Sequence, residues 1–232
     1  MRLLITRTLA GALLVAATAA PAAAQITWSS TQATLTGDPG YGGQTLLVNF
    51  ESAVPGISYT GSYTIGTGLV SGFRAPPFGV TNNYFATPNV NGNSSGTAKI
   101  DFSTFLAGQS VNALSFYWGS IDSYNTLEVL GAGDVVLKTI LGTDVVNPAD
   151  GNQTASDTNR RLFLNFAGSS TTDFRALRLT SNGRAFEIDD IAGTFSGGGV
   201  VTPEPSTYAM LAAGLLAVGV AGRRRRRSST QG

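Results

Sequence analysis

The segment 25–199 is predicted to be all-β, an antiparallel two-sheet β-sandwich of jelly-roll type. It shows almost no helical periodicity, and its short apolar or alternating runs are separated by stretches rich in Gly, Ser, Thr and Asn. No linker-like composition divides the segment, so one domain is expected. The runs give thirteen candidate strands in chain order: 26–29, 45–50, 58–65, 68–72, 83–87, 97–102, 113–118, 126–130, 135–141, 161–166, 174–180, 184–188 and 191–195.

The apolar positions of these runs predict which side chains form the core. In the later runs every second residue is apolar, as a strand with one buried face requires. These positions are Leu162, Leu164, Phe166, Leu177, Leu179, Phe186 and Ile188. The run 113–118 is apolar at nearly every position and predicts a central strand, whose aromatic residues are interpreted as core.

The residues between the runs predict how the strands connect. Asn182 and Gly183 separate two runs, and Asn-Gly is the strongest short hairpin signal, so 175–180 and 184–188 are expected to pair. A longer glycine-containing turn at 130–134 is expected to join the strands on either side of it. The glycines at 197–199 are expected to form a flexible hinge after the domain.

The N-terminal residues 1–24 have the three parts of a secretory signal peptide. Arg2 and Arg7 precede the apolar stretch 8–20, and Ala22 and Ala24 supply the small side chains that signal peptidase requires. Cleavage by signal peptidase is therefore expected before Gln25. The alternative interpretation is a buried N-terminal helix.

The C-terminal residues 200–232 combine an apolar segment with a cluster of cations. The 17 residues 206–222 would span roughly 25 Å as a helix, against a hydrocarbon core of about 30 Å, and are interpreted as a short transmembrane helix. The stop-transfer cations that follow are Arg223, Arg224, Arg225, Arg226 and Arg227. Because such cations stay in the cytoplasm, the preceding chain is expected outside that membrane. A core helix and a basic nucleic-acid tail are the disfavoured alternatives.

Pro203, Glu204 and Pro205 lie directly before the apolar segment. Proline lacks a backbone donor and biases its predecessor toward extended geometry, so this tripeptide is expected to be open to a processing enzyme. Tripeptide, apolar segment and arginine cluster together resemble the PEP-CTERM sorting signal of bacterial surface proteins handled by exosortase, although Tyr208 stands where that pattern usually has Trp. The resemblance implies export, transient anchoring in the inner membrane, removal of the tail, and release to the cell surface or an exopolysaccharide matrix.

The composition excludes several classes of chemistry. Without cysteine there are no disulfides, thiolate zinc sites or cysteine nucleophiles, and without histidine there is no Ser-His-Asp triad. The whole chain has a formal net charge of +1, but the segment 25–199 holds eight of the cations and 13 of the acids, a net charge of −5. An acidic exported domain is not expected to bind nucleic acid.

Paired carboxylates are the remaining route to catalysis. Asp189 with Asp190, or Asp122 with Glu187, could converge in space and act as the two carboxyl groups of a glycosidase do. The acidic residues are nevertheless scattered mostly singly through predicted turns. A non-enzymatic protein is therefore expected, and a carboxylate-dependent secreted hydrolase is the least favoured alternative.

Calcium is the one metal for which the sequence offers ligands. Asp122, Asp189 and Asp190 are hard oxygen ligands, and loop oxygens such as those of Asn125 and Asp150 could complete a site. No spacing matches an EF-hand, and solvated turn carboxylates are the favoured interpretation. Calcium binding stays open, and no other cofactor is expected.

Aromatic residues in predicted loops suggest a carbohydrate-binding alternative. Phe73, Phe78, Tyr84 and Tyr124 lie in stretches rich in Gly, Pro and Asn, where exposed rings could stack on sugars of an exopolysaccharide. The same rings could instead cover the ends of a sandwich. The favoured function is a structural or adhesive component of the cell surface or extracellular matrix, with a carbohydrate-binding module as the first alternative.

Overall fold

A computed structural model of the chain describes residues 25–89 and 94–197. The predicted signal peptide, the sorting tripeptide, the apolar segment 206–222 and the arginine cluster lie outside these residues. Within the described residues, no helix has the length and apolarity that a membrane crossing needs.

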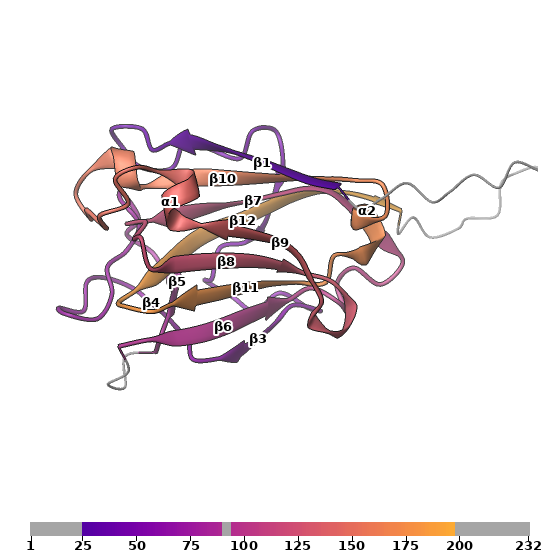
Figure 1. The fold of residues 1–232 in the computed structure, drawn as a ribbon, viewed down its shortest axis with the longest axis horizontal. Coiled ribbons are helices and arrows are strands. Elements are labelled where there is room, and N and C mark those ends of the chain that lie inside the picture. Colours follow the sequence, from indigo (N-terminus) through magenta and orange to yellow (C-terminus); the bar gives the residue numbers. More distant parts are fainter. Residues whose placement is uncertain (1–24, 90–93, 198–232) are drawn as a thin grey trace, which may run out of the picture.

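The described chain folds into two antiparallel sheets, which confirms the all-β prediction (Figure 1). The seven-stranded sheet runs in the order β1 (Gln25–Gln32), β10 (Arg160–Ala167), β7 (Gln109–Gly119), β12 (Phe186–Gly197), β5 (Tyr84–Thr87) and β4 (Thr64–Gly66), with β2 (Thr45–Val48) also paired to β12. The five-stranded sheet runs in the order β3 (Ser58–Gly61), β6 (Gly96–Asp101), β11 (Ala176–Ser181), β8 (Asn125–Leu130) and β9 (Val136–Leu141). The helical turns are η1 (Ala132–Asp134), α1 (Gly142–Val145), η2 (Ser156–Thr158) and α2 (Ser170–Asp173).

The core lies between the two sheets and contains the side chains that alternation predicted. Leu162 and Leu164 of β10 belong to the same buried cluster as Leu177 and Leu179 of β11, which lies in the other sheet. The run 113–118 forms part of β7, which pairs on both sides, so its prediction as a central strand is confirmed. Large apolar side chains from both sheets thus exclude water from a single core.

Three strand predictions are wrong in detail. The run 58–65 divides into β3 and β4, which lie in different sheets, because the chain turns at Gly61 with a φ of 91°. The run 68–72 is a turn closed by an isolated bridge between Val70 and Arg74. The runs 184–188 and 191–195 are parts of one strand, β12, whose register shifts between Asp189 and Ala192.

That register shift decides how two neighbouring carboxylates, Asp189 and Asp190, are oriented. One extra residue is accommodated on β12, and Asp190 adopts a φ of 46°. Strict alternation would send Asp189 and Asp190 to opposite faces. Because the bulge interrupts alternation, Ile188 and Ile191 both belong to the core while the two aspartates between them do not.

The hairpin predicted at Asn182 and Gly183 is also wrong. β11 pairs with β6 and β8, whereas β12 lies in the other sheet, so the chain crosses between sheets here. The Tyr124 ring fills the space beside Gly183, where a Cβ would lie 2.7 Å from the ring. By contrast, the glycine-containing turn at 130–134 does join two paired strands, β8 and β9, as predicted.

Part of the outer face of the seven-stranded sheet, over β10, β7 and β12, is polar and is buried under the loops that carry Asp38 and Pro77. Residues on this face with almost no exposure are Ser115, Tyr117, Arg161, Glu187 and Asp189. The covering loops approach closely, since a Cβ at Gly119 would lie 2.3 Å from Pro77, and the Tyr117 hydroxyl donates to the Phe78 carbonyl at 2.8 Å. This polar layer, called the outer layer below, continues into a pocket at one end of the sandwich.

Candidate functional site

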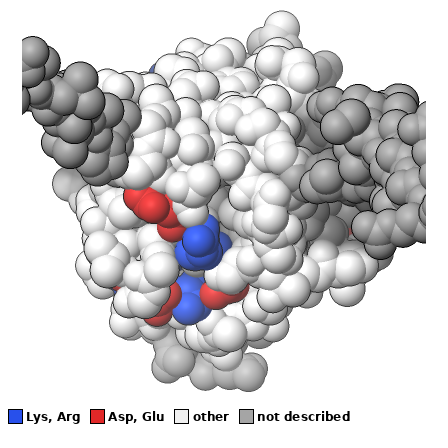
Figure 2. All heavy atoms as spheres, turned by 90° about the vertical axis from the view of Figure 1, so that its right-hand side faces the viewer, with Lys and Arg blue, Asp and Glu red and all other residues white. Residues whose placement is uncertain are grey.

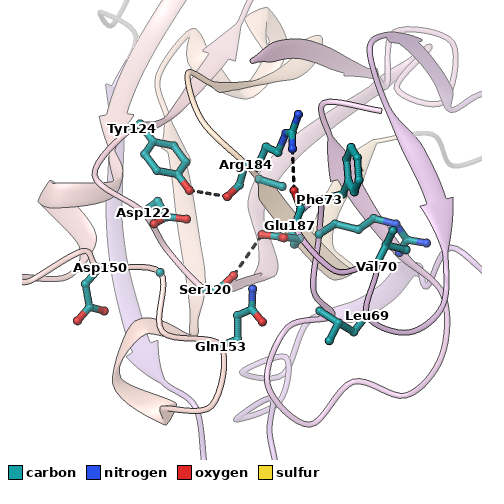
Figure 3. Close-up of a pocket in the computed structure, with 14 residues that line it drawn as sticks. Leu69, Val70, Phe73, Ser120, Asp122, Tyr124, Asp150, Gln153, Arg184 and Glu187 are labelled. Atoms are coloured by element: carbon teal, nitrogen blue, oxygen red, sulfur yellow. Dashed lines mark hydrogen bonds between the residues drawn. The ribbon is translucent and has the colours of Figure 1, made fainter. Parts of the chain in front are cut away.

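A polar pocket of about 300 Å³ lies where several connections meet at one end of the sandwich (Figure 3). The loop after β4, the β7–β8 turn, the loop before η2 and the β11–β12 connection all contribute to it. Its lining residues with functional side chains are Phe73, Arg74, Ser120, Asp122, Tyr124, Asp150, Gln153, Arg184 and Glu187. This volume is at the lower end of the range of about 300–1,000 Å³ that is typical of small-molecule sites.

A buried asparagine positions the β7–β8 turn. The Asn125 side-chain oxygen accepts a hydrogen bond from the Asp122 backbone N–H at 2.9 Å, and the Asn125 N–H donates to the Asp122 carbonyl at 3.1 Å. The Asn125 amide nitrogen donates to the carbonyl of Ala185 at 2.9 Å. Asn125 is completely buried, so it ties the turn to the β11–β12 connection and is no open ligand for calcium.

Asp122 stands on one wall of the pocket, beside Gly151. A Cβ at Gly151 would lie 2.2 Å from the Asp122 carboxylate, so a side chain there would displace it. Burial raises the pKa of Asp122 to about 6, and the charge of Asp150 acts in the same direction. At neutral pH Asp122 is therefore mostly ionised, but it takes up a proton in mildly acidic conditions.

Glu187 of β12 lies at the base of the pocket. Its carboxyl oxygens accept hydrogen bonds from the Ala75 backbone N–H at 3.1 Å and from the Ser120 hydroxyl at 3.3 Å. Only 1% of the residue is exposed. Burial above all, with a smaller contribution from the Asp122 charge, raises the pKa of Glu187 to about 8, so the carboxyl is mainly neutral at pH 7.

The structure brings together two of the four aromatic residues proposed for sugar contact. Phe73 and Tyr124 both line the pocket and lie on opposite sides of it, with Arg184 between them (Figure 3). The Arg184 guanidinium lies 4.5 Å from the Phe73 ring centroid, and its Nη1 donates to the Gly72 carbonyl at 2.9 Å. The Tyr124 hydroxyl donates to the Arg184 carbonyl at 2.5 Å.

The other two aromatic residues have structural contacts. Tyr84 is completely buried and its hydroxyl donates to the Gly68 carbonyl at 2.8 Å, so the expectation that it is an exposed platform is wrong. Phe78 is half-buried, and its backbone binds Tyr117 and Asn159 rather than lining the pocket. Neither ring belongs to the candidate site.

The three carboxylates proposed for calcium are not brought together. Asp122 lines the pocket, whereas Asp189 and Asp190 do not. The Asp190 carboxylate accepts a hydrogen bond from the Tyr41 hydroxyl at 2.9 Å. The part of the chain that the structure describes contains no group of three or more acidic side chains arranged to hold a metal ion.

Asp189 and Asp190 instead adjoin a buried cation in the outer layer. Arg161 donates through Nε and Nη2 to both oxygens of Asp38, and through Nη1 to the Asp190 carbonyl at 2.9 Å. Asp189 is buried, and its Oδ1 has no hydrogen-bond partner among the residues 25–89 and 94–197. Burial raises the pKa of Asp189 to about 8, so this carboxyl is mainly neutral at pH 7.

At the opposite end of the sandwich, charged side chains pair with one another at the surface. Figure 2 shows a small group of cationic and anionic side chains on a face that is otherwise largely uncharged. A hollow at this end is lined by Lys99, Asp101, Asp134 and Arg175. Lys99 lies 3.0 Å from Asp134 and 3.7 Å from Asp101, so these charges neutralise one another.

Several polar residues at or near the pocket, among them Arg184, Gln153 and Asn159, were not singled out from the sequence. Arg184 and Gln153 line it, and buried Asn159 holds its surroundings by accepting hydrogen bonds from the backbone N–H groups of Phe78 and Ser120, both at 2.9 Å. Each is a polar residue at a strand end or in a loop. Nothing in local spacing distinguishes them, because their partners are remote in sequence.

Comparison with known protein families gives a match outside the described domain. Residues 201–227 match the model of the PEP-CTERM protein-sorting motif. The chain carries a PEP-CTERM sorting motif. This confirms the prediction made from Pro203, Glu204 and Pro205 with the apolar segment and arginines. A search of curated proteins found no match.

The PEP-CTERM motif indicates how the chain is exported and sorted. It indicates export and exosortase-dependent processing at the membrane, on the way to the cell surface. The last strand of the sandwich, β12, ends at Gly197, and the PEP-CTERM motif begins at residue 201. The folded domain and the sorting motif are therefore separate, consecutive parts of the chain.

Proposed function

We propose that this chain is a non-enzymatic component of the cell surface or extracellular matrix with a structural or adhesive role. Signal peptidase removes residues 1–24, the apolar segment 206–222 anchors the chain transiently in the inner membrane, and exosortase releases the domain near Pro203, Glu204 and Pro205. The observation that carries the proposal is the PEP-CTERM motif placed directly after a complete β-sandwich.

The properties of the domain support a role outside the cell. Its core unites both sheets without any cysteine, so its stability does not depend on the redox state of the compartment. The net charge of −5 over 25–199 favours solubility and opposes adsorption to anionic surfaces. Such a domain suits a component that persists on an envelope or within a matrix.

Intact mass spectrometry of the protein recovered from producing cells tests this proposal. With exosortase present, the expected mass corresponds to a chain that starts at Gln25 and lacks Arg223 to Arg227. Without exosortase, the arginine-bearing form is expected to remain with the membrane fraction. A released product that still carries the arginines would contradict exosortase processing.

A second candidate function is carbohydrate binding, favoured by the pocket that joins Phe73 and Tyr124 to the carboxylate of Asp122. The ligand would be a polysaccharide of the surface or matrix to which the protein is sorted. Retardation of the mature protein in gels containing that polysaccharide is expected, and unaltered mobility would count against binding. Release of reducing sugars in the same mixture would instead favour the carboxylate-dependent hydrolase, since Asp122 and Glu187 both line this pocket.

Calcium stabilisation is a separate part of this second candidate. It predicts a higher melting temperature of the mature protein in calcium than in a chelator. Equal melting temperatures would remove calcium from the proposal without bearing on carbohydrate binding by the pocket.

A further inference from the structure

The pocket joins features that suit a ligand rich in hydroxyl groups. Acceptors stand on one side, where the carboxylates of Asp122 and Asp150 and the amide of Gln153 contribute to the lining. Ring surface from Tyr124 and Phe73 stands on both sides, with the Arg184 guanidinium packed over the Phe73 ring (Figure 3). Sugars present hydroxyl donors at their edges and C–H groups on their faces, so this combination of acceptors and rings is complementary to them.

The base of the pocket adds a carboxyl group that is held in place. Both oxygens of Glu187 accept hydrogen bonds, from Ala75 and from Ser120, and the side chain is almost completely buried. A carboxyl kept neutral by burial also has a proton to donate. The base of the pocket therefore does not present a full negative charge to a ligand.

The charges around the pocket favour a neutral ligand over an anionic one. Asp122 and Asp150 face the space, and Asp122 is mostly ionised at neutral pH. The Arg184 guanidinium is held over Phe73 and bound to Gly72, and the Arg74 guanidinium donates to the carbonyls of Gly66, Gly68 and Thr67. A phosphate, sulfate or uronic acid would be repelled by these carboxylates, while both guanidiniums already bind backbone carbonyls.

We infer that this pocket binds one neutral sugar unit of an extracellular polysaccharide, with Asp122 and Gln153 accepting hydrogen bonds from its hydroxyls and Tyr124 and Phe73 flanking it. The inference rests on the second candidate function, carbohydrate binding. It adds where the sugar binds, which residues contact it and that the recognised unit is uncharged. The approximate 300 Å³ of the pocket limits occupancy to a small part of a polymer. Affinity for a single unit is accordingly weak, and many copies along a matrix polymer would add by multivalency.

The test is calorimetric titration of the mature protein with the exopolysaccharide purified from the producing bacterium. Two variants alter the pocket: Asp122→Asn removes the charge while conserving shape, and Gln153→Ala truncates an exposed side chain that can be lost without unfolding the domain. Lys99→Gln, in the hollow at the opposite end, is the matched control. Near-ultraviolet circular dichroism of each variant verifies that the fold is retained.

The expected result is a loss of affinity of at least about tenfold in Asp122→Asn, a smaller loss in Gln153→Ala, and none in Lys99→Gln; tenfold corresponds to about 1.4 kcal/mol. Wild-type affinity that persists in both folded pocket variants would overturn the location while leaving carbohydrate binding intact. Absence of binding by the wild-type protein would overturn both.

Titration with neutral dextran and with anionic alginate separates the charge classes, and tighter pocket-dependent binding of alginate would overturn the preference for a neutral unit.

Discussion

Both faces of the seven-stranded sheet have buried side chains where β10, β7 and β12 pair, but these are buried by different means. On the inner face, apolar side chains such as Leu162 and Trp118 pack against the second sheet. On the outer face, the neighbouring residues Arg161 and Tyr117 bind polar groups of the covering loops. The comparison shows that one sheet can use non-directional burial on one side and specific hydrogen bonding on the other, and only the second side has polar groups from which a binding pocket can be built.

The difference extends to how each face depends on solution conditions. Trp118 stacks on Phe186 with ring centroids 4.3 Å apart, a contact without titratable groups. The outer layer contains Glu187 and Asp189, whose pKa values burial raises to about 8. The inner face is therefore expected to be insensitive to pH and the outer layer sensitive to it.

The largest effect is expected from breaking the buried ion pair of the outer layer. Arg161→Met leaves Asp38 without its partner and is expected to lower the free energy of unfolding by about 3–5 kcal/mol. Leu162→Ala, one residue along β10 and on the inner face, is expected to cost about 2–5 kcal/mol through loss of packing. Urea denaturation of both variants measures the two faces on one scale.

A double variant of the ion pair distinguishes the cost in stability of an unpaired charge from the cost of lost packing. The double variant Asp38→Leu with Arg161→Met is expected to recover part of the loss, since no unpaired charge then remains at this pair. A loss below about 1 kcal/mol in Arg161→Met alone would show that the outer layer adds little to stability.

The second prediction concerns pH. An unfolded glutamate loses its proton near pH 4.5, whereas folded Glu187 keeps its proton until about pH 8. Its stabilising contribution is therefore complete below the unfolded pKa and is lost as pH rises toward 8, by about 3 kcal/mol between pH 5 and 8. Asp189 acts in the same direction.

Thermal unfolding of wild type and Glu187→Gln between pH 5 and 8.5 measures this dependence. The variant cannot ionise at this position, so its melting temperature is expected to fall less steeply with rising pH than that of the wild type. Parallel pH profiles would show that Glu187 does not carry the effect.

A smaller loss is expected from Asn159→Ala. The substitution removes the acceptor shared by the backbone N–H groups of Phe78 and Ser120, and is expected to cost about 2 kcal/mol. Asn165→Ala, an exposed position on β10, which begins directly after Asn159, is the matched control and is expected to change stability by less than about 0.5 kcal/mol. Equal losses in the two variants would mean that the hydrogen bonds of Asn159 are not what stabilises the loop.

The smallest effect is expected at the end of the sandwich away from the pocket. Lys99→Gln removes the ion pairs with Asp134 and Asp101, which are partly exposed, and is expected to cost less than about 1 kcal/mol. Raising the salt concentration should reduce even this difference. A loss in the free energy of unfolding as large as that of Arg161→Met would contradict the expectation that partly exposed ion pairs stabilise the domain less than the buried pair of the outer layer.

The sequence predicts the inner face better than the outer layer. Alternation identifies Leu162, Leu164, Leu177 and Leu179 because burial against a second sheet imposes a period of two. Arg161 also follows that alternation, but the pattern predicts that a polar residue at this position faces solvent. Its partner Asp38 is 123 residues away, so no local pattern reports the pair.

The sequence predicts only part of the candidate site, because contacts remote in sequence decide which loop residues reach the pocket. Phe73, Tyr124 and Asp122 are recognisable by residue type in loops, and all three line the pocket. Tyr84 looks the same in sequence but is covered by the loop whose Gly68 carbonyl accepts its hydrogen bond. The hairpin signal at Asn182 failed because contacts remote in sequence, such as those of buried Asn125 with Ser181 and with the Ala185 carbonyl, outweigh a local turn preference.

The ionisation of Glu187 tests most directly the claim that the outer layer is a buried polar layer in which Glu187 and Asp189 are held neutral. The segment 25–199 contains three glutamates, Glu51, Glu128 and Glu187, so ¹³C NMR of protein labelled at glutamate side-chain carboxyls gives few signals, and Glu187→Gln assigns one of them. The expected titration midpoint of Glu187 is about 8. A midpoint near the ordinary glutamate value of about 4.3 would contradict the account.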